Sequence, residues 1–189
     1  MAHIQTTPPT VDPLTLAEVK AHIRVTHNDD DIYISTLITS ARRMIEQSYD
    51  LCLLQQSWSV FLDRWPAEGA VTLPLFPLLS VVDIKIYGDD DVAATLDHAH
   101  YFLDAASRPA RVTLRNGRTF PQPGRGVNGI EIKLITGFGA VANTVPEAIK
   151  QALLMIISGW FASRGDVDAG AFPATALTLL APYRNVRLT

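Results

Sequence analysis

The sequence has 189 residues, of which 48% are hydrophobic and 19% are charged, so it has the composition of a globular protein and not of a disordered one. Its formal net charge is −3, which argues against a dedicated nucleic-acid binder, because such proteins normally carry a basic excess. The single cysteine, Cys52, excludes an intrachain disulfide, and the amino end lacks the basic and apolar regions expected of a secretion signal.

The first part of the chain is predicted to be helical after an extended start. Residues 1–12 contain two adjacent prolines and are expected to form an extended arm. Thr15 and Glu18 have the spacing of a capping box, which predicts a short helix to about Ile23. A second helix is predicted over residues 30–49, because its apolar residues recur with the helical period along one face.

The middle of the chain shows the alternation that is typical of β-strands. Apolar and polar residues alternate, and turn residues separate the short runs, so residues 57–136 are predicted to form an antiparallel β unit. The clearest strand places Val82, Ile84 and Ile86 on its buried face. A strand over residues 130–136 precedes the next helix.

A helix predicted over residues 144–164 is the most apolar element of the sequence. Thr144 and Glu147 again have the spacing of a capping box. One apolar stripe suffices to face a core, yet this helix has a second stripe beside the first. The members of the second stripe are Leu154, Ile157 and Phe161. The helix is therefore either a plain core helix or one that also forms an interface between copies of the chain, with this second stripe in the contact.

These elements predict an α+β fold, in which a helical bundle forms the core and an antiparallel β unit is inserted into it. The helices over residues 30–49 and 144–164 are expected to pack together. The predicted parts are an extended arm (1–12), an N-terminal helical part (13–56), a β insert (57–143) and a C-terminal helical part with a tail (144–189).

Three features contain residue types that occur in catalytic or binding sites, but each lacks the neighbouring residues or elements that such a site needs. The run from Gly124 to Gly129 matches G-x-G-x-x-G, yet a strand follows it where a dinucleotide-binding motif has a helix, so a loop is expected. His98 and His100 lack a third spaced metal ligand. Cys52 has no neighbouring base and is expected to be a buried thiol. The sequence therefore predicts no catalytic, cofactor-binding or metal-binding residues.

The order and spacing of six short segments resemble a known protein family. The segments are residues 14–25, 29–42, 54–58, 73–81, 135–139 and 145–154. Together they resemble the head–tail connector (adaptor) proteins of tailed bacteriophages, prophages and gene transfer agents, over about residues 13–183. Members of that family are helical proteins with a β insert and have no catalytic residues.

The resemblance implies a structural, non-enzymatic function without a cofactor. It implies a homo-oligomeric ring, twelve-fold by the resemblance, which lies beneath the portal protein, joins the DNA-filled head to a stopper or tail-terminator protein, and lets DNA pass through its lumen. Such a protein belongs to the neck of a virion or virus-like particle, is assembled in the bacterial cytoplasm, and contacts no membrane. The residues leave open one alternative, a small ligand-binding or enzymatic α+β domain with a pocket in the β insert.

The tail after a predicted short helix near residues 173–181 has the pattern of a docking segment. Apolar residues alternate with arginines, which suits an extended strand added to the sheet edge of a partner. On the resemblance this partner is the portal protein; a frayed end or a segment folded back on its own subunit is the alternative. The residues predicted to dock are Tyr183, Arg184, Val186, Arg187 and Leu188.

The lumen of a connector is expected to be mixed or negative in charge. Each contact of a Lys or Arg side chain with a DNA phosphate strengthens binding, and strong binding would hinder the movement of DNA through the channel. One of two acidic turns, residues 29–31 or 89–91, is expected to line the channel.

Overall fold

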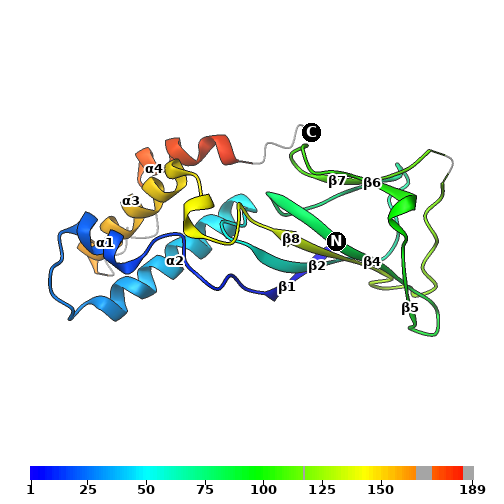
Figure 1. Ribbon diagram of the computed structural model, residues 1–189, viewed down its shortest axis with the longest axis horizontal. Coiled ribbons are helices and arrows are strands. Elements are labelled where there is room, and N and C mark those ends of the chain that lie inside the picture. The colour runs from blue at the N-terminus through cyan, green and yellow to red at the C-terminus, as the bar shows by residue number, and fades with distance from the viewer. Residues whose placement is uncertain (117, 165–171, 185–189) are drawn as a thin grey trace. The chain divides into compact units, whose positions relative to one another are not determined.

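The computed structural model describes residues 1–116, 118–164 and 172–184, and the chain divides into two compact units (Figure 1). The β unit consists of Met1–Pro9 and Gln55–Phe138, and the helical unit of Thr10–Leu54 and Gly139–Thr189. Helices and antiparallel sheets are thus segregated, which confirms the predicted α+β class. Each unit is built from two separate stretches of the chain.

The helical unit is organised around its third α-helix. The α-helices are α1 (Leu16–Ile23), α2 (Asp31–Tyr49), α3 (Glu147–Ser163) and α4 (Ala174–Leu180), with the 3-10 helices η2 (Ala142–Thr144) and η4 (Ala181–Tyr183). α3 contacts each of the other three α-helices, which confirms the expected packing of α2 against α3. The core is formed by fully buried apolar side chains of these two helices. Among them are Ile34, Ile45, Ile149 and Leu153.

α1 begins with the predicted capping box. The backbone N–H of Glu18 donates to Oγ1 of Thr15 at 3.2 Å, and the backbone N–H of Thr15 donates to Oε2 of Glu18 at 2.7 Å. The box satisfies a first-turn N–H that has no partner within the helix, together with the N–H of the capping residue. Hydrogen bonds from the hydroxyl and the backbone N–H of Thr15 also lower the pKa of Glu18.

The capping box predicted at Thr144 is wrong. α3 begins at Glu147, its N-cap is Pro146, and no side chain caps it. Thr144 ends η2, where its hydroxyl donates to the backbone carbonyl of Val141 at 2.6 Å. A residue that precedes proline is held in the extended region, so Val145 cannot continue a helical turn from Thr144 into α3.

The strands of the β unit form two antiparallel sheets. They are β1 (Ala2–Thr7), β2 (Gln56–Leu62), β3 (Ala70–Thr72), β4 (Leu78–Tyr87), β5 (Ala93–Thr95), β6 (Tyr101–Asp104), β7 (Arg111–Leu114) and β8 (Ile130–Thr136). The larger sheet has the order β1-β2-β8-β4-β5, and the smaller has the order β3-β7-β6. Both contribute to one hydrophobic core, for example through Ile84 and Ile132 of the larger sheet and Val112 of the smaller.

The predicted extended arm is an edge strand of the larger sheet. β1 pairs with β2, with His3 opposite Val60, and all six residues of β1 are exposed. Polar residues such as threonine and glutamine prevail in it, so the sequence alternation that marks a half-buried strand is absent.

The buried face of β4 differs from the prediction at one position. Val81, Ile84 and Ile86 are buried, whereas Val82 is 50% exposed. The pairing with β8 shifts by one residue between Val81 and Asp83, which is a β-bulge. The extra residue reverses the alternation on one side of the bulge, and the period of the sequence alone does not reveal this.

Candidate functional site

His98, His100 and Cys52, which could in principle bind a metal or act as a nucleophile, instead lie in places where they pack or form hydrogen bonds within the fold. Among the residues that the structure describes, no group of three or more His, Cys, Asp or Glu side chains is placed to hold a metal ion. His98 and His100 lie in the 3-10 helix η1 (His98–His100), and Nδ1 of His98 is 2.5 Å from the hydroxyl of Tyr101. Cys52 is fully buried, as predicted. Within the described ranges, none of the helices is long and apolar enough to cross a membrane.

The glycine-rich run from Gly124 to Gly129 closes the end of β4. The backbone N–H of Gly124 donates to the carbonyl of Tyr87 at 3.0 Å, and the N–H of Tyr87 donates to the carbonyl of Gly129 at 2.9 Å. A Cβ atom on Gly124 would lie 2.4 Å from the backbone nitrogen of Asp89, so no larger residue fits without a shift. The run leads into β8 and not into a helix, so its backbone groups serve the sheet and not a phosphate.

Burial divides the predicted interface stripe of α3. Ile157 is fully buried within the helical unit, where it is part of the core. Leu154 and Phe161 are only partly buried. The ring centroid of Phe161 lies 6.1 Å from that of Tyr33, and the guanidinium carbon of Arg164 lies 5.3 Å from the centroid of Phe161. Leu154 and Phe161 are therefore the members of the stripe that a neighbouring molecule can reach.

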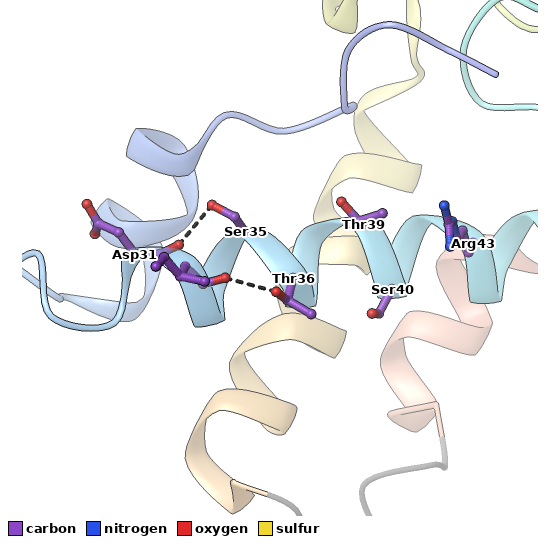
Figure 2. A pocket seen from close by; sticks show the side chains of 7 residues that line it. Asp31, Ser35, Thr36, Thr39, Ser40 and Arg43 are labelled. Atoms are coloured by element: carbon purple, nitrogen blue, oxygen red, sulfur yellow. Dashed lines mark hydrogen bonds between the residues drawn. The ribbon is translucent and has the colours of Figure 1, made fainter.

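A hollow of about 560 Å³ lies along one side of α2, and all the described residues that line it belong to that helix (Figure 2). The lining residues are Asp31, Ile32, Ser35, Thr36, Thr39, Ser40 and Arg43. The hydroxyls of Ser35 and Thr36 donate to backbone carbonyls of the preceding turn, at 2.8 and 2.9 Å. Ile32 is 87% exposed. This side of α2 thus presents short polar side chains and one unburied apolar residue to solvent.

Lysine and arginine side chains pair with two of the three aspartates in the acidic turn 29–31, and Oδ2 of the third, Asp29, lies 3.5 Å from Nδ1 of His27. Oδ1 of Asp31 lies 2.6 Å from Nζ of Lys20, and Oδ2 of Asp30 lies 2.9 Å from Nη2 of Arg164. The side chain of Asp29 is 91% exposed. The negative charge that this turn presents to solvent is therefore mainly that of Asp29.

The outer side of the larger sheet has a buried carboxylate at its centre. Glu131 of β8 accepts hydrogen bonds from the hydroxyl of Ser59 on β2, at 2.7 Å, and from the hydroxyl of Tyr87 on β4, at 2.8 Å. Burial raises the pKa of Glu131, but the two hydrogen bonds and the charges of Lys133 and Lys85 together outweigh burial, and the pKa is lowered overall. The hydrogen bond to Glu131 is also the main cause that raises the pKa of Tyr87. One ionised side chain thus joins three strands.

A second hollow, of about 510 Å³, lies beside β5 in the β unit. Its lining combines apolar side chains with the carboxylates of Asp90 and Asp97, and no lysine or arginine is among the described residues that line it. The lining residues are Ile86, Tyr87, Gly88, Asp90, Val92, Ala94, Thr95, Leu96, Asp97, His100, Pro121 and Gln122. We call this the acidic hollow.

The smaller sheet has an exposed aromatic and basic surface. Phe102 is 50% exposed, and the guanidinium carbon of Arg115 lies 3.8 Å from the centroid of its ring. Nε of Arg115 donates to the backbone carbonyl of Tyr101 at 3.1 Å, which holds the pair in place. Arg118 is also exposed. We call Phe102, Arg115 and Arg118 the aromatic–basic surface. Sequence motifs do not reveal this surface, because its members lie in no known motif.

The turn between β6 and β7 is held by Asp104. Its carboxylate accepts hydrogen bonds from the hydroxyl of Ser107 at 2.6 Å and from Nη2 of Arg111 at 2.7 Å. The hydrogen bonds from Ser107 and Arg111 lower the pKa of Asp104 to about 2. The charge of Arg111 is thus compensated within the β unit.

The predicted docking tail is described only at its start. Tyr183 ends η4, and the backbone N–H of Arg184 donates to the carbonyl of Ala181 at 3.2 Å. The other predicted docking residues lie outside the described residues. They are Val186, Arg187 and Leu188.

A protein-family comparison matches the first part of the chain. Residues 13–87 match the family described as Phage gp6-like head-tail connector protein. No curated protein sequence matches the chain. The family match includes α1, α2 and the strands β2, β3 and β4, and so extends across parts of both units.

Solved structures with a similar fold come from gene transfer agent (GTA) particles. A chain from the neck of an empty GTA particle, computed with C6 symmetry, is 24% identical, with a TM-score of 0.86 and coverage of 100% of this chain and 98% of that chain. Chains from the virion of a native GTA particle and from its neck, computed with C12 symmetry, are each 23% identical, with a TM-score of 0.83 and the same coverage. The resemblance predicted from the sequence is therefore confirmed: the chain matches the phage gp6-like head–tail connector family over residues 13–87 and has, over its whole length, the fold of these GTA particle chains.

Proposed function

We propose that this protein is a structural head–tail connector (adaptor) that forms a ring in the neck of a virion or virus-like particle. The observation that carries the proposal is the match of the complete fold, both units included, to neck chains of GTA particles. The family match over residues 13–87 supports it separately, because that match rests on the sequence. No comparison favours the alternative of a ligand-binding or enzymatic domain.

The ring is proposed to contain twelve copies of the chain. The related neck structures were computed with C6 and C12 symmetry, and a twelve-membered ring satisfies both symmetries. A closed ring needs a head-to-tail contact between neighbouring subunits. Leu154 and Phe161 of α3 are proposed for that contact in the helical unit, because they remain partly exposed on an otherwise apolar helix.

The ring is proposed to bind the portal protein on one side and a stopper or tail-terminator protein on the other. DNA passes through its lumen without being held, and the ring is assembled in the bacterial cytoplasm. The tail is proposed to dock on the portal, since arginines alternate with apolar residues beyond Pro182. Its docking residues are Tyr183, Arg184, Val186, Arg187 and Leu188.

The proposal is tested by reconstitution with purified components. The native mass of the protein is measured alone and with portal-bearing, DNA-filled heads, and the complexes are imaged by electron microscopy. We expect rings that sit on the portal vertex and leave the other vertices free. A protein that stays monomeric and binds no portal-bearing head under conditions where the portal is intact would exclude the connector function.

A further inference from the structure

We propose that neighbouring β units of the ring dock on each other, with the aromatic–basic surface of one copy seated on the acidic hollow of the next. This inference rests on the proposed ring and adds a second subunit contact to the one proposed for α3. The inference names the surface that each of the two neighbouring copies contributes to the contact. Because these surfaces differ in charge, an exchange of charges between them can test it.

The first supporting observation is a division of charge along the β unit. Residues 86–104 contain five aspartates and no lysine or arginine, and residues 105–130 contain five arginines and no acidic residue. A protein with a net charge of only −3 thus carries two consecutive segments of opposite sign. The acidic hollow belongs mainly to the first segment, and Arg115 and Arg118 belong to the second.

Only part of this charge is compensated within the chain. Arg111 pairs with Asp104 at 2.7 Å, and Arg125 pairs with Asp91 at 3.4 Å. In the described ranges, no ion pair within 4.0 Å engages the remaining exposed members of either segment. Those members are Asp89, Asp90, Asp97, Arg108, Arg115 and Arg118. Both surfaces therefore have unpaired charge that is available to a partner.

The elements that carry most of the two surfaces lie apart within the β unit. The surfaces adjoin at one point, where the backbone N–H of Arg115 donates at 3.0 Å to the carbonyl of His100, a residue that lines the acidic hollow. In Figure 1, the β6–β7 hairpin, which carries Phe102, lies at the upper side of this unit, and β5 lies at its lower side. A ring of identical subunits is closed by a heterologous contact, in which two different surfaces of each copy meet. Two complementary surfaces that are centred on separate elements, the β6–β7 hairpin and β5, are suited to such a contact.

The chemistry of the two surfaces also matches. Aromatic and arginine side chains are the residues that most often anchor protein interfaces, and here Phe102 and Arg115 are already stacked before any partner binds. Ile86, Val92 and Leu96 line the hollow and offer apolar contacts to the aromatic side chain of Phe102. The carboxylates in its lining can accept charge-assisted hydrogen bonds from a guanidinium group.

A second copy of the chain fits these surfaces better than DNA does. DNA phosphates would be attracted by Arg115 and Arg118 but repelled by Asp90 and Asp97, so DNA accounts for only one of the two surfaces. A neighbouring copy accounts for both. Complementary charge of this kind chiefly selects the partner and its orientation, and it makes association depend on salt.

The test is a charge swap in the full-length protein. One variant combines Asp90→Arg with Asp97→Arg, a second combines Arg115→Glu with Arg118→Glu, and a third carries all four changes. Each of the first two places like charges opposite each other. We expect the protein concentration at which half of the chains are in rings to rise about tenfold or more for each. The third variant restores complementarity with the signs exchanged, and we expect assembly close to that of the wild type.

The matched control reverses two exposed charges elsewhere in the β unit, Arg64→Glu with Glu68→Arg, and is expected to assemble like the wild type. Ring formation is measured by native mass spectrometry at several salt concentrations, and thermal melting confirms that each variant is folded. Phe102→Ser tests the aromatic anchor without a change of charge, and it is expected to weaken assembly in the same direction.

The outcomes separate this inference from the proposed function. The inference is overturned, and the connector function stands, if the wild type forms rings and one of the two double variants is folded and assembles as well as the wild type. The inference is equally overturned if the reversals keep their rings but lose binding to DNA or to portal-bearing heads, because the surfaces then serve another partner. Failure of the wild type to form rings or to bind heads overturns the proposed function instead.

Discussion

At the scale of single residues, Glu131 holds the middle of the larger sheet as an anion. Its pKa in the folded protein is lowered from the ordinary value of 4.5, so folding favours the ionised form. The stability that this preference contributes is fully present above the ordinary pKa of the unfolded chain. It is lost as the pH falls through the lowered pKa of the folded state.

We therefore expect Glu131→Gln to be less stable than the wild type by about 1 kcal/mol at neutral pH, because a charge-assisted hydrogen bond is replaced by a neutral one. The free energy of unfolding is measured by urea denaturation over a series of pH values. The difference between the two proteins should narrow as the pH falls below about 4.5. A difference that is constant down to pH 3 would contradict the role of the ionised carboxylate. The exposed Glu68→Gln serves as a control and is expected to change stability by less than about 0.5 kcal/mol.

This role of Glu131 is not predictable from the local sequence. Glu131 stands at a polar position of an alternating strand and is expected there to face solvent. Its partners Ser59 and Tyr87 lie 72 and 44 residues away along the chain. Only the strand order β2-β8-β4 brings the three side chains together, and strand order depends on long-range pairing.

At the scale of elements, the two capping-box patterns in the sequence have different outcomes in the structure. We expect Thr15→Ala to reduce the free energy of unfolding by about 1 kcal/mol, since it removes a side-chain cap from α1. Thr144→Ala is the matched comparison and should cost less, because Thr144 caps no α-helix. Chemical denaturation of both variants measures the two costs. Equal losses would show that the box at α1 contributes nothing specific.

The exposed part of the α3 stripe leads to a second prediction at this scale. Phe161→Asp is expected to leave the fold intact and abolish ring assembly, since Phe161 is only partly buried within its own subunit. Ile157→Asp is expected to unfold the helical unit, because it places a charge in a fully buried position. Circular dichroism reports the fold and native mass spectrometry reports the ring. Normal rings of the Phe161 variant would remove α3 from the subunit contact.

The elements themselves were largely predictable, and the exceptions have physical causes. α2 and α3 follow a strong helical period, and β8 begins with a regular alternation of apolar and polar residues, so local pattern suffices for them. Val82 was assigned to the wrong face because a bulge depends on the pairing of β4 with β8. The start of α3 was misplaced because the restriction imposed by Pro146 outweighs the cap pattern. The aromatic–basic surface was missed since no single motif contains Phe102 and Arg115.

At the scale of the whole molecule, a channel protein should bind DNA weakly. The isolated protein is acidic overall, and the lumen is expected to be mixed or negative in charge. We expect the Kd for duplex DNA to be above about 10⁻⁴ M at physiological salt, which is the weak end of ordinary non-specific binding. Fluorescence anisotropy with a short labelled duplex is a suitable measurement. Micromolar binding would mean that the ring holds DNA and does not merely let it pass.

The tail gives a further prediction at this scale. A chain truncated after Ala181 lacks the predicted docking residues but keeps α4, whose last residue is Leu180. We expect the truncated chain to form rings and to lose most of its binding to portal-bearing heads. Sedimentation of heads with labelled protein measures this binding. Full binding by the truncated chain would show that the tail is not the docking element.

The division of each unit between two stretches of the chain affects synthesis on the ribosome. α2 ends at Tyr49, but α3, which covers its apolar face, begins only at Glu147. A nascent chain therefore keeps that face of α2 without its cover until α3 has been translated, about 100 residues later. Chains that terminate early lack both the cover of the core and the α3 residues proposed for the subunit contact. We expect such incomplete products to be open to cellular proteases and, if α3 forms the proposed subunit contact, to be excluded from the proposed ring.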